Sequence, residues 1–94
     1  MEQLPKFFAG EVLREEFLRP MGLSARKLAR RMGVPANRIT QIAAGQRRIT
    51  AATAVRLERA LGASAEFWMR LQVGCDLARA GHVRAVPVTG RGLR

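Results

Sequence analysis

Apolar residues recur at helical spacing in five stretches of the chain, and turn-forming residues separate these stretches. Within each stretch the apolar positions are three or four residues apart, which places them on one face of a helix. Alternating β-branched runs, which are typical of strands, are missing before the C-terminal tail. We therefore predict an all-α domain over residues 10–80. Its five expected helices cover residues 10–19, 24–32, 36–44, 51–61 and 65–80.

Hydroxyl residues and glycines mark the expected ends of these helices. A serine or threonine side chain at a helix start accepts a hydrogen bond from a backbone N–H that otherwise lacks a partner. Glycine readily adopts the left-handed conformation that follows a helix, and proline disfavours helix continuation. The expected starts are Ser24, Thr50 and Ser64, and the expected ends are Pro20 with Gly22, Gly33, Gly45 and Gly62.

The second and third helices are joined by a short turn that contains Gly33, which is the pattern of a helix-turn-helix unit. In such units the start of the second helix enters the major groove of DNA. With Ile39 and Ile42 buried, the opposite side of this helix is free to read bases. Asn and Gln side chains pair with adenine, and Arg pairs with guanine. The predicted base-reading residues are Ala36, Asn37, Arg38, Thr40 and Gln41.

Polar and basic residues at two neighbouring points are placed to contact DNA phosphates. One group lies at the start of the 24–32 helix, and the other follows the 36–44 helix. Contacts of this kind position a protein on DNA without specifying the sequence. The predicted phosphate-contacting residues are Ser24, Arg26, Lys27, Gln46, Arg47 and Arg48. Two alternatives remain open: Asn37 has a local turn or capping role, and Arg47 and Arg48 are a solvated pair.

The charge distribution supports a polyanionic partner. The chain of 94 residues has a net charge of +10, and no acidic residue lies between Glu16 and Glu58. For a small domain, a clustered positive charge favours nucleic acid as the partner. The alternative is an arginine-rich composition without functional meaning, since most of the cations are arginine. The clustering of the cations in the acid-free middle of the chain favours the first interpretation.

The expected last helix carries more apolar residues than one core-facing stripe requires. We assign Phe67, Leu71, Cys75 and Ala78 to the core. A helix that is apolar around most of its circumference needs a second partner, and we predict a second copy of the chain, forming a homodimer. Alternatively, Trp68 covers the end of a monomer's own core. The residues assigned to the dimer interface are Trp68, Met69, Val73 and Leu77.

The two ends of the chain fall outside the predicted helices. Residues 1–9 read as an N-terminal arm, in which Phe8 is placed to pack against the first helix. Residues 81–94 are rich in Gly, Pro and Arg. We expect them to form a flexible or extended basic tail, and a short strand over 83–88 remains open. Its arginines either contact phosphate or are solvated.

Catalytic and cofactor chemistry is poorly represented in the chain. The single histidine, His82, lies in the expected tail, and Glu15 and Glu16 point in different directions on a helix. The single cysteine, Cys75, excludes an internal disulfide and is expected on a buried helix face. No glycine-rich phosphate loop is present. We predict no enzyme activity, no catalytic residues, no metal and no cofactor. No apolar run approaches the ~20 residues that span a bilayer, so we expect a soluble, cytoplasmic protein.

Three segments outside the helix-turn-helix carry a family resemblance: GEVLREEFL, ITAATAVRLERALG and SAEFWMRLQ. From about Phe8 to Leu77 the chain resembles the HigA-type (also called VapI-type) antitoxins of the Cro/C1 (XRE) helix-turn-helix superfamily. The resemblance implies a five-helix, lambda-repressor-like domain that forms a homodimer. The resemblance also implies two partners. One is double-stranded DNA, the palindromic operator of the protein's own operon, and the other is a HigB-like toxin that cleaves mRNA.

Two other functions remain open from the sequence. The first is an orphan transcriptional regulator of the same fold without a toxin partner. The second is a basic module that binds an acidic protein or RNA. Sequence preference in DNA binding separates the second from the others, and a neighbouring toxin-like gene separates the antitoxin from the orphan regulator.

Overall fold

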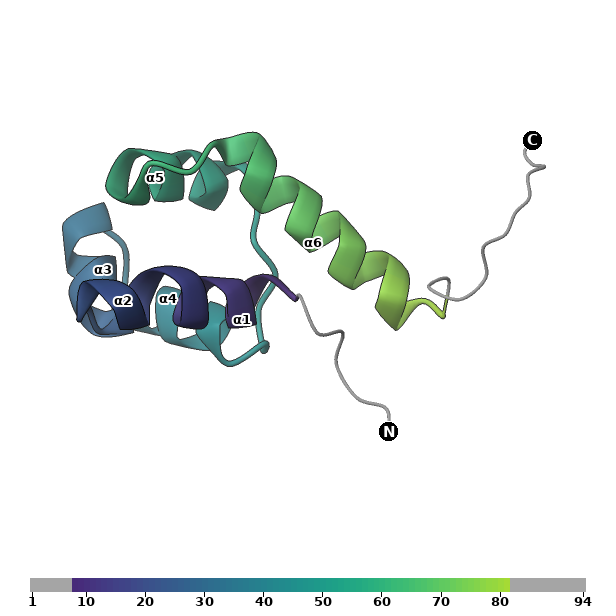
Figure 1. The fold of residues 1–94 in the computed structure, drawn as a ribbon, viewed down its shortest axis with the longest axis horizontal. Helices are drawn as coiled ribbons and strands as arrows, with labels where there is room; N and C mark the ends of the chain where they lie inside the picture. Colours follow the sequence, from purple (N-terminus) through teal and green to yellow (C-terminus); the bar gives the residue numbers. More distant parts are fainter. Residues whose placement is uncertain (1–7, 82–94) are drawn as a thin grey trace.

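The computed structural model describes residues 8–81, and every regular element in this range is helical. The first three elements follow one another without a break and form a single helix, so the fold has the five helices that we predicted (Figure 1). The elements are α1 (Ala9–Val12), η1 (Leu13–Leu18), α2 (Arg19–Met21), α3 (Ala25–Met32), α4 (Ala36–Ala43), α5 (Ala51–Leu61) and α6 (Ala65–Arg79). Most of the expected arm, and the expected tail with its arginines and its short strand, lie outside the described residues.

The first helix is longer than predicted, because Pro20 does not end it. The helix continues to Met21 and ends at Gly22, which has a left-handed conformation. The segment before the proline, Leu13–Leu18, is wound as a π-helix. Proline cannot donate the usual backbone hydrogen bond, and its ring crowds the preceding turn. The helix accommodates Pro20 because the turns before it are wound more widely, as a π-helix.

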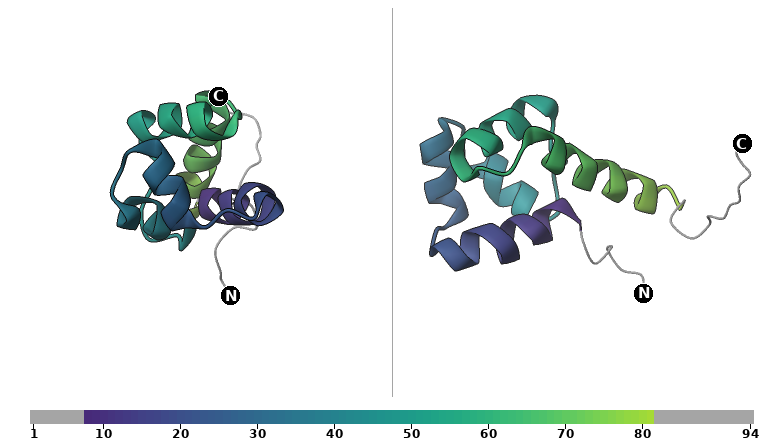
Figure 2. Two further views of the ribbon diagram at one scale, coloured as in Figure 1. Left: turned by 90° about the vertical axis from the view of Figure 1, so that its left-hand side faces the viewer. Right: turned by 45° about the horizontal axis from the view of Figure 1, so that its top comes forward.

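The helices pack in two pairs that the first helix connects. α3 packs on α4, and α5 packs on α6, while α1 contacts both α4 and α6. α3 also contacts α5, which closes the core. Figures 1 and 2 show α6 leaving the end of α5 and extending past the other helices. In Figure 1, α3 lies at one end of the arrangement, α4 packs beside the first helix, and the last turns of α6 extend toward the other end.

The core is formed by the apolar faces of all five helices, and Ile39 and Ile42 are buried as predicted. Burial of such side chains is the main driving force of folding. Ile49, in the loop before α5, also points inward and is fully buried. The largest side chains that are fully buried are Trp68, Leu13, Leu28, Ile39, Ile42, Ile49, Leu57 and Thr53.

The face of α6 that packs on the core differs from the predicted one. Trp68 has no exposed surface, whereas Phe67 is 37% exposed. The Trp68 ring lies 5.0 Å from the rings of both Phe17 and Phe67, measured between centroids. The assignment of Trp68 to a dimer interface was therefore wrong, and the alternative, that it completes the monomer's own core, is correct. The cause is helical geometry: Trp68, Gln72 and Cys75 share one face of α6, and the polar Gln72 obscures this face in the sequence.

Candidate nucleic-acid interface

The start of α3 is fixed by the predicted cap. The Ser24 hydroxyl accepts a hydrogen bond from the backbone N–H of Lys27 at 3.0 Å. Ser24, Arg26 and Lys27 are all exposed, so the first turn of α3 presents two cations beside the unpaired N–H groups of a helix start. Such an end attracts anions, phosphate groups included.

The turn between α3 and α4 is held by backbone and side-chain hydrogen bonds. Gly33 has a φ of 72°, a left-handed conformation that glycine adopts without strain. The N–H groups of Gly33 and Val34 donate back to the carbonyls of Arg30 and Ala29 at 3.2 and 3.1 Å. From α5, Arg56 donates to the Met32 carbonyl at 2.8 Å. These contacts set the position from which α4 departs.

The buried side of α4 is the one predicted from the sequence. Ile39 and Ile42 are 0% and 1% exposed. Successive residues of a helix are turned by about 100°, so Asn37 and Gln41, one turn apart, lie opposite these isoleucines. Asn37 is exposed, and the other four predicted base-reading residues are partly exposed: Ala36, Arg38, Thr40 and Gln41. The structure thus gathers all five of them on α4.

Local hydrogen bonds narrow what two of these side chains can do. Pro35 is the N-cap residue of α4, and no side-chain hydrogen bond caps this helix start. The Thr40 hydroxyl donates to the Asn37 carbonyl at 3.4 Å, within the helix itself. The Thr40 hydroxyl proton is thus used within the helix, whereas its methyl group is of the kind that contacts a thymine methyl group.

The loop after α4 presents the second predicted group, Gln46, Arg47 and Arg48, and all three are exposed. Arg47 and Arg48 are not a simple solvated pair, because each has a partner on a different helix. The Arg47 Nε donates to the Gln41 Oε1 at 2.9 Å, on α4. Arg48 forms a hydrogen-bonded ion pair with Asp76 at 2.5 Å, on α6.

A polar network on α6, which is not among the residues predicted from the sequence, holds this loop. The Gln72 Oε1 accepts the Ile49 backbone N–H at 2.7 Å, and the Gln72 amide donates to Asp76 at 2.9 Å. Arg79 donates to the Gly45 carbonyl at 3.1 Å. The hydrogen bond from Arg48, and then that from Gln72, lowers the pKa of the Asp76 carboxyl, while Asp76 raises the pKa of Arg48. In the sequence, this network is indicated only by the four-residue spacing of Gln72 and Asp76, which places both on one helix face.

Of the predicted dimer residues on α6, three retain surface. Val73 and Leu77 are 50% and 45% exposed, and Met69 is partly buried. Cys75 is buried as predicted, and its sulfur accepts the Ala9 backbone N–H at 3.2 Å. Among residues 8–81 no three acidic, histidine or cysteine side chains gather as metal ligands, and no helix in that range is long and apolar enough to cross a bilayer.

Comparison with known proteins tests the fold and the family. A family model described as Helix-turn-helix matches residues 13–68, which is more than half of the chain. The chain belongs to the helix-turn-helix family. As a member of this family it is not an enzyme, and its relatives are antitoxins and regulators.

The relatives of this helix-turn-helix protein carry the names that the sequence resemblance suggested. Virulence-associated protein I of Dichelobacter nodosus is 47% identical over 83% of this chain and 72% of that protein. Antitoxin HigA-1 of Vibrio cholerae is 43% identical over 72% of this chain and 64% of that protein. The solved structure of Pseudomonas aeruginosa antitoxin HigA with the higBA promoter is 36% identical in sequence to this chain and matches its fold with a TM-score of 0.78. The match covers 90% of this chain and 100% of that one. The resemblance to HigA and VapI antitoxins is thereby confirmed.

Proposed function

We propose that this helix-turn-helix protein is a HigA-type antitoxin that binds the operator of its own operon. One observation carries the proposal: a single short unit presents the basic start of α3, the outward side of α4 and the basic loop after α4. Similarity to a HigA antitoxin solved with promoter DNA supports DNA as the ligand.

The residues divide into two roles in this proposal. Asn37, Arg38 and Gln41 read base edges in the major groove, with Ala36 and the Thr40 methyl group beside them. Ser24, Arg26 and Lys27 contact the phosphates that flank the groove, as do the exposed residues of the loop after α4. The first group supplies specificity, and the second supplies affinity that depends on salt.

We expect the protein to bind DNA from upstream of its own gene about 1,000-fold or more tightly than shuffled DNA of equal length. The reason is that base contacts from α4 add to a phosphate contribution that both DNAs share. Fluorescence anisotropy at matched salt concentration measures the two dissociation constants. Equal affinity for the two DNAs would overturn the proposal and favour a general polyanion-binding module.

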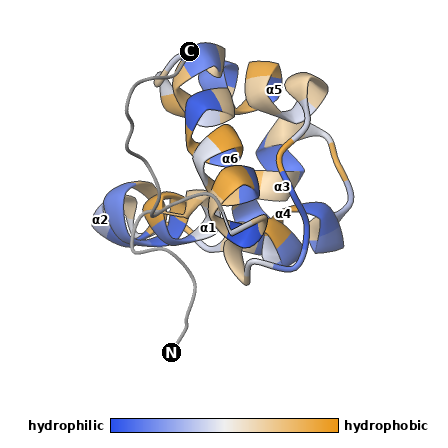
Figure 3. Ribbon diagram, turned by 90° about the vertical axis from the view of Figure 1, so that its right-hand side faces the viewer, coloured by the Kyte–Doolittle hydropathy of each residue, from blue (hydrophilic) through white to orange (hydrophobic). Residues whose placement is uncertain are grey.

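A homodimer is the second part of the proposal. Figure 3 shows hydrophobic residues along α6. Val73 and Leu77, one turn apart in the C-terminal half of this helix, are about half exposed. Paired α6 helices would bury these side chains and Met69 together. The two copies of α4 would then read half-sites about 34–36 Å apart, so a palindromic operator is expected.

We expect Val73→Glu and Leu77→Glu to give monomers and to weaken operator binding by about 100-fold or more, because two linked half-site contacts gain affinity over one. Light scattering measures the mass, and anisotropy measures the binding. Val55→Glu is the matched control, since Val55 is also an exposed valine, at 42%, but lies on α5. A wild-type monomer at micromolar concentration would contradict the dimer.

The third part is neutralisation of a HigB-like, mRNA-cleaving toxin, and similarity to named HigA antitoxins supports it. The gene beside the operator distinguishes this function from the runner-up, an orphan regulator of the same fold. A small toxin-like reading frame whose product stops growth alone, but not together with this protein, supports the antitoxin. Operator binding without such a neighbour supports the orphan regulator.

A further inference from the structure

We infer that Arg47 determines base specificity by positioning Gln41, in addition to any contact with phosphate. This inference rests on the proposed DNA-binding function and assigns a role that differs from the one expected from the sequence. The observation is the hydrogen bond from the Arg47 Nε to the Gln41 Oε1 at 2.9 Å. It joins a loop residue to a side chain on the reading side of α4.

The backbone brings these two residues together before any DNA is bound. Gly45 has a φ of 78°, and it turns the chain back at the end of α4. The Gln46 N–H then donates to the Gln41 carbonyl at 2.8 Å, and the Gly45 N–H donates to the Ile42 carbonyl at 3.0 Å. This is the Schellman type of helix ending, which fixes the path of the residues that follow. Arg47 therefore emerges beside the turn of α4 that carries Gln41.

The chemistry of the pair determines which way the Gln41 amide faces. A guanidinium group has only donors, so only the amide oxygen can face Arg47. The NH₂ group of Gln41 is consequently turned away from Arg47. Because Gln41 lies opposite the buried Ile39 and Ile42, on the side of α4 that faces DNA in the proposed function, its NH₂ group is the part of the amide left for a base.

This orientation changes the base that Gln41 favours. Bidentate pairing with adenine requires the amide oxygen to accept from the adenine N6 while the NH₂ group donates to N7. The Arg47 hydrogen bond occupies one of the two lone pairs of the Gln41 oxygen and holds this oxygen toward the loop, so Gln41 meets the base chiefly through its NH₂ donor. Donors suit the acceptor atoms of guanine and thymine, which are N7 and O6 in guanine and O4 in thymine. The Arg47–Gln41 pair therefore disfavours adenine at the position that Gln41 reads.

The neighbouring residue Arg48 provides a control within the chain. It has the same charge, lies in the same loop and is exposed, but its hydrogen-bond partner is Asp76 on α6. A phosphate contact by either arginine would weaken binding to every sequence equally and lower the salt dependence. Of the two arginines, Arg47 is the one that donates to a base-reading side chain.

The test is selection from a random double-stranded DNA library by the wild type and by Arg47→Ala, Arg48→Ala, Gln41→Ala and the Arg47→Ala/Gln41→Ala double variant. Dissociation constants are then measured on operators that differ at single positions. All three substituted residues have exposed surface, and thermal unfolding checks that each of the four variants is folded. We expect Arg47→Ala and Gln41→Ala to alter preference at the same base position. The loss of discrimination there should be about two- to tenfold, the effect of one hydrogen bond.

Three further results separate the possibilities. Arg47→Ala should bind operators with adenine at that position more tightly than the wild type does. The double variant should retain the same discrimination at that position as Gln41→Ala alone, because Arg47 acts there through Gln41. Arg48→Ala should keep the wild-type preference at every position. If Arg47→Ala also keeps it, and weakens all sequences by one factor, the inference is overturned while the proposed function stands. If the wild type selects no preferred sequence, the proposed function itself fails.

Discussion

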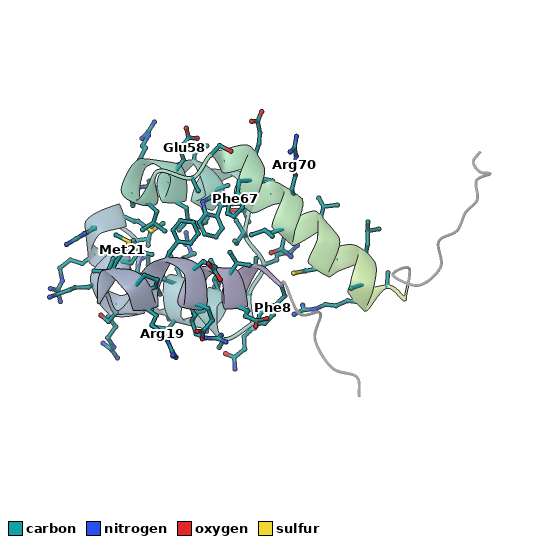
Figure 4. All side chains as sticks on the ribbon, viewed as in Figure 1. Phe8, Arg19, Met21, Glu58, Phe67 and Arg70 are labelled. Carbon is teal, nitrogen blue, oxygen red and sulfur yellow. The ribbon has the colours of Figure 1, made fainter. Side chains whose placement is uncertain are left out.

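Replacing Trp68 with alanine is expected to lower the free energy of unfolding by about 3–5 kcal/mol. Trp68 is the largest fully buried side chain, and it contacts Phe17 from the first helix and Phe67 from its own helix. Removing it would leave a cavity between Phe17 and Phe67, and Figure 4 shows Phe67 in the space between α6 and the first helix. Natural domains are stable by only about 5–15 kcal/mol, so a loss of this size threatens the fold.

Urea denaturation followed by circular dichroism measures the loss, and two substitutions serve as controls. Trp68→Phe keeps most of the apolar contact. It also removes the indole N–H, which has no hydrogen-bond partner among the described residues, so its cost should be much smaller. Arg70→Ala, at an exposed position of the same helix outside the proposed dimer interface, should change stability little. Equal stability of Trp68→Ala and Arg70→Ala would show that Trp68 does not anchor α6.

The parts of the fold that depend on local chemistry could be predicted from the sequence. Ser24, Thr50 and Ser64 cap three helices, each accepting from the backbone N–H three residues later. Such caps involve neighbours along the chain, so the sequence contains both partners. The apolar spacing of α3 and α4 likewise determines which side of each helix is buried.

The parts that were missed depend on distant residues. Gln72 belongs to the core face of α6 because it satisfies the backbone of Ile49, which is 23 residues away in the sequence. Without this partner a glutamine reads as a surface residue, and the expected stripe was therefore placed on Phe67 instead of Trp68. The π-helical segment before Pro20 is a similar case, because burial of Leu13 and Leu18 holds the helix together across a residue that usually ends one.

The candidate site shows the same division. The five residues on α4 could be placed from Ile39 and Ile42 alone, since helical geometry relates them directly. The partner of Arg48 lies 28 residues later on α6, and no local pattern indicates it. The Arg47–Gln41 contact spans only six residues, but it forms because Gly45 reverses the chain. The position of the candidate interface therefore depends on local patterns, whereas its internal hydrogen bonds depend on contacts that the folded chain brings together.

The last prediction compares two glycines whose replacement should act in opposite directions. Gly10 lies where α1 crosses α4, and a Cβ atom there would stand 2.1 Å from the Ile42 carbonyl oxygen and 3.0 Å from that of Ala43. Backbone oxygens cannot rotate aside, so Gly10→Ala must push the helices apart. We expect a loss of at least about 1–3 kcal/mol, the usual cost of overpacking. Gly74 lies within α6, and a Cβ atom added there would stand in open space.

Gly74→Ala should therefore stabilise the protein by about 0.5–1 kcal/mol, because alanine is the better helix former. Thermal unfolding measures both variants, and each kcal/mol corresponds to about 4–8 °C in a domain of this size. Operator binding adds a functional readout, since displacing α1 also displaces α4, which carries the base-reading residues. Gly10→Ala should bind operator DNA more weakly than Gly74→Ala even at temperatures where both are folded. Equal affinities would mean that the contact of α1 with α4 supports the fold without setting the position of the reading helix.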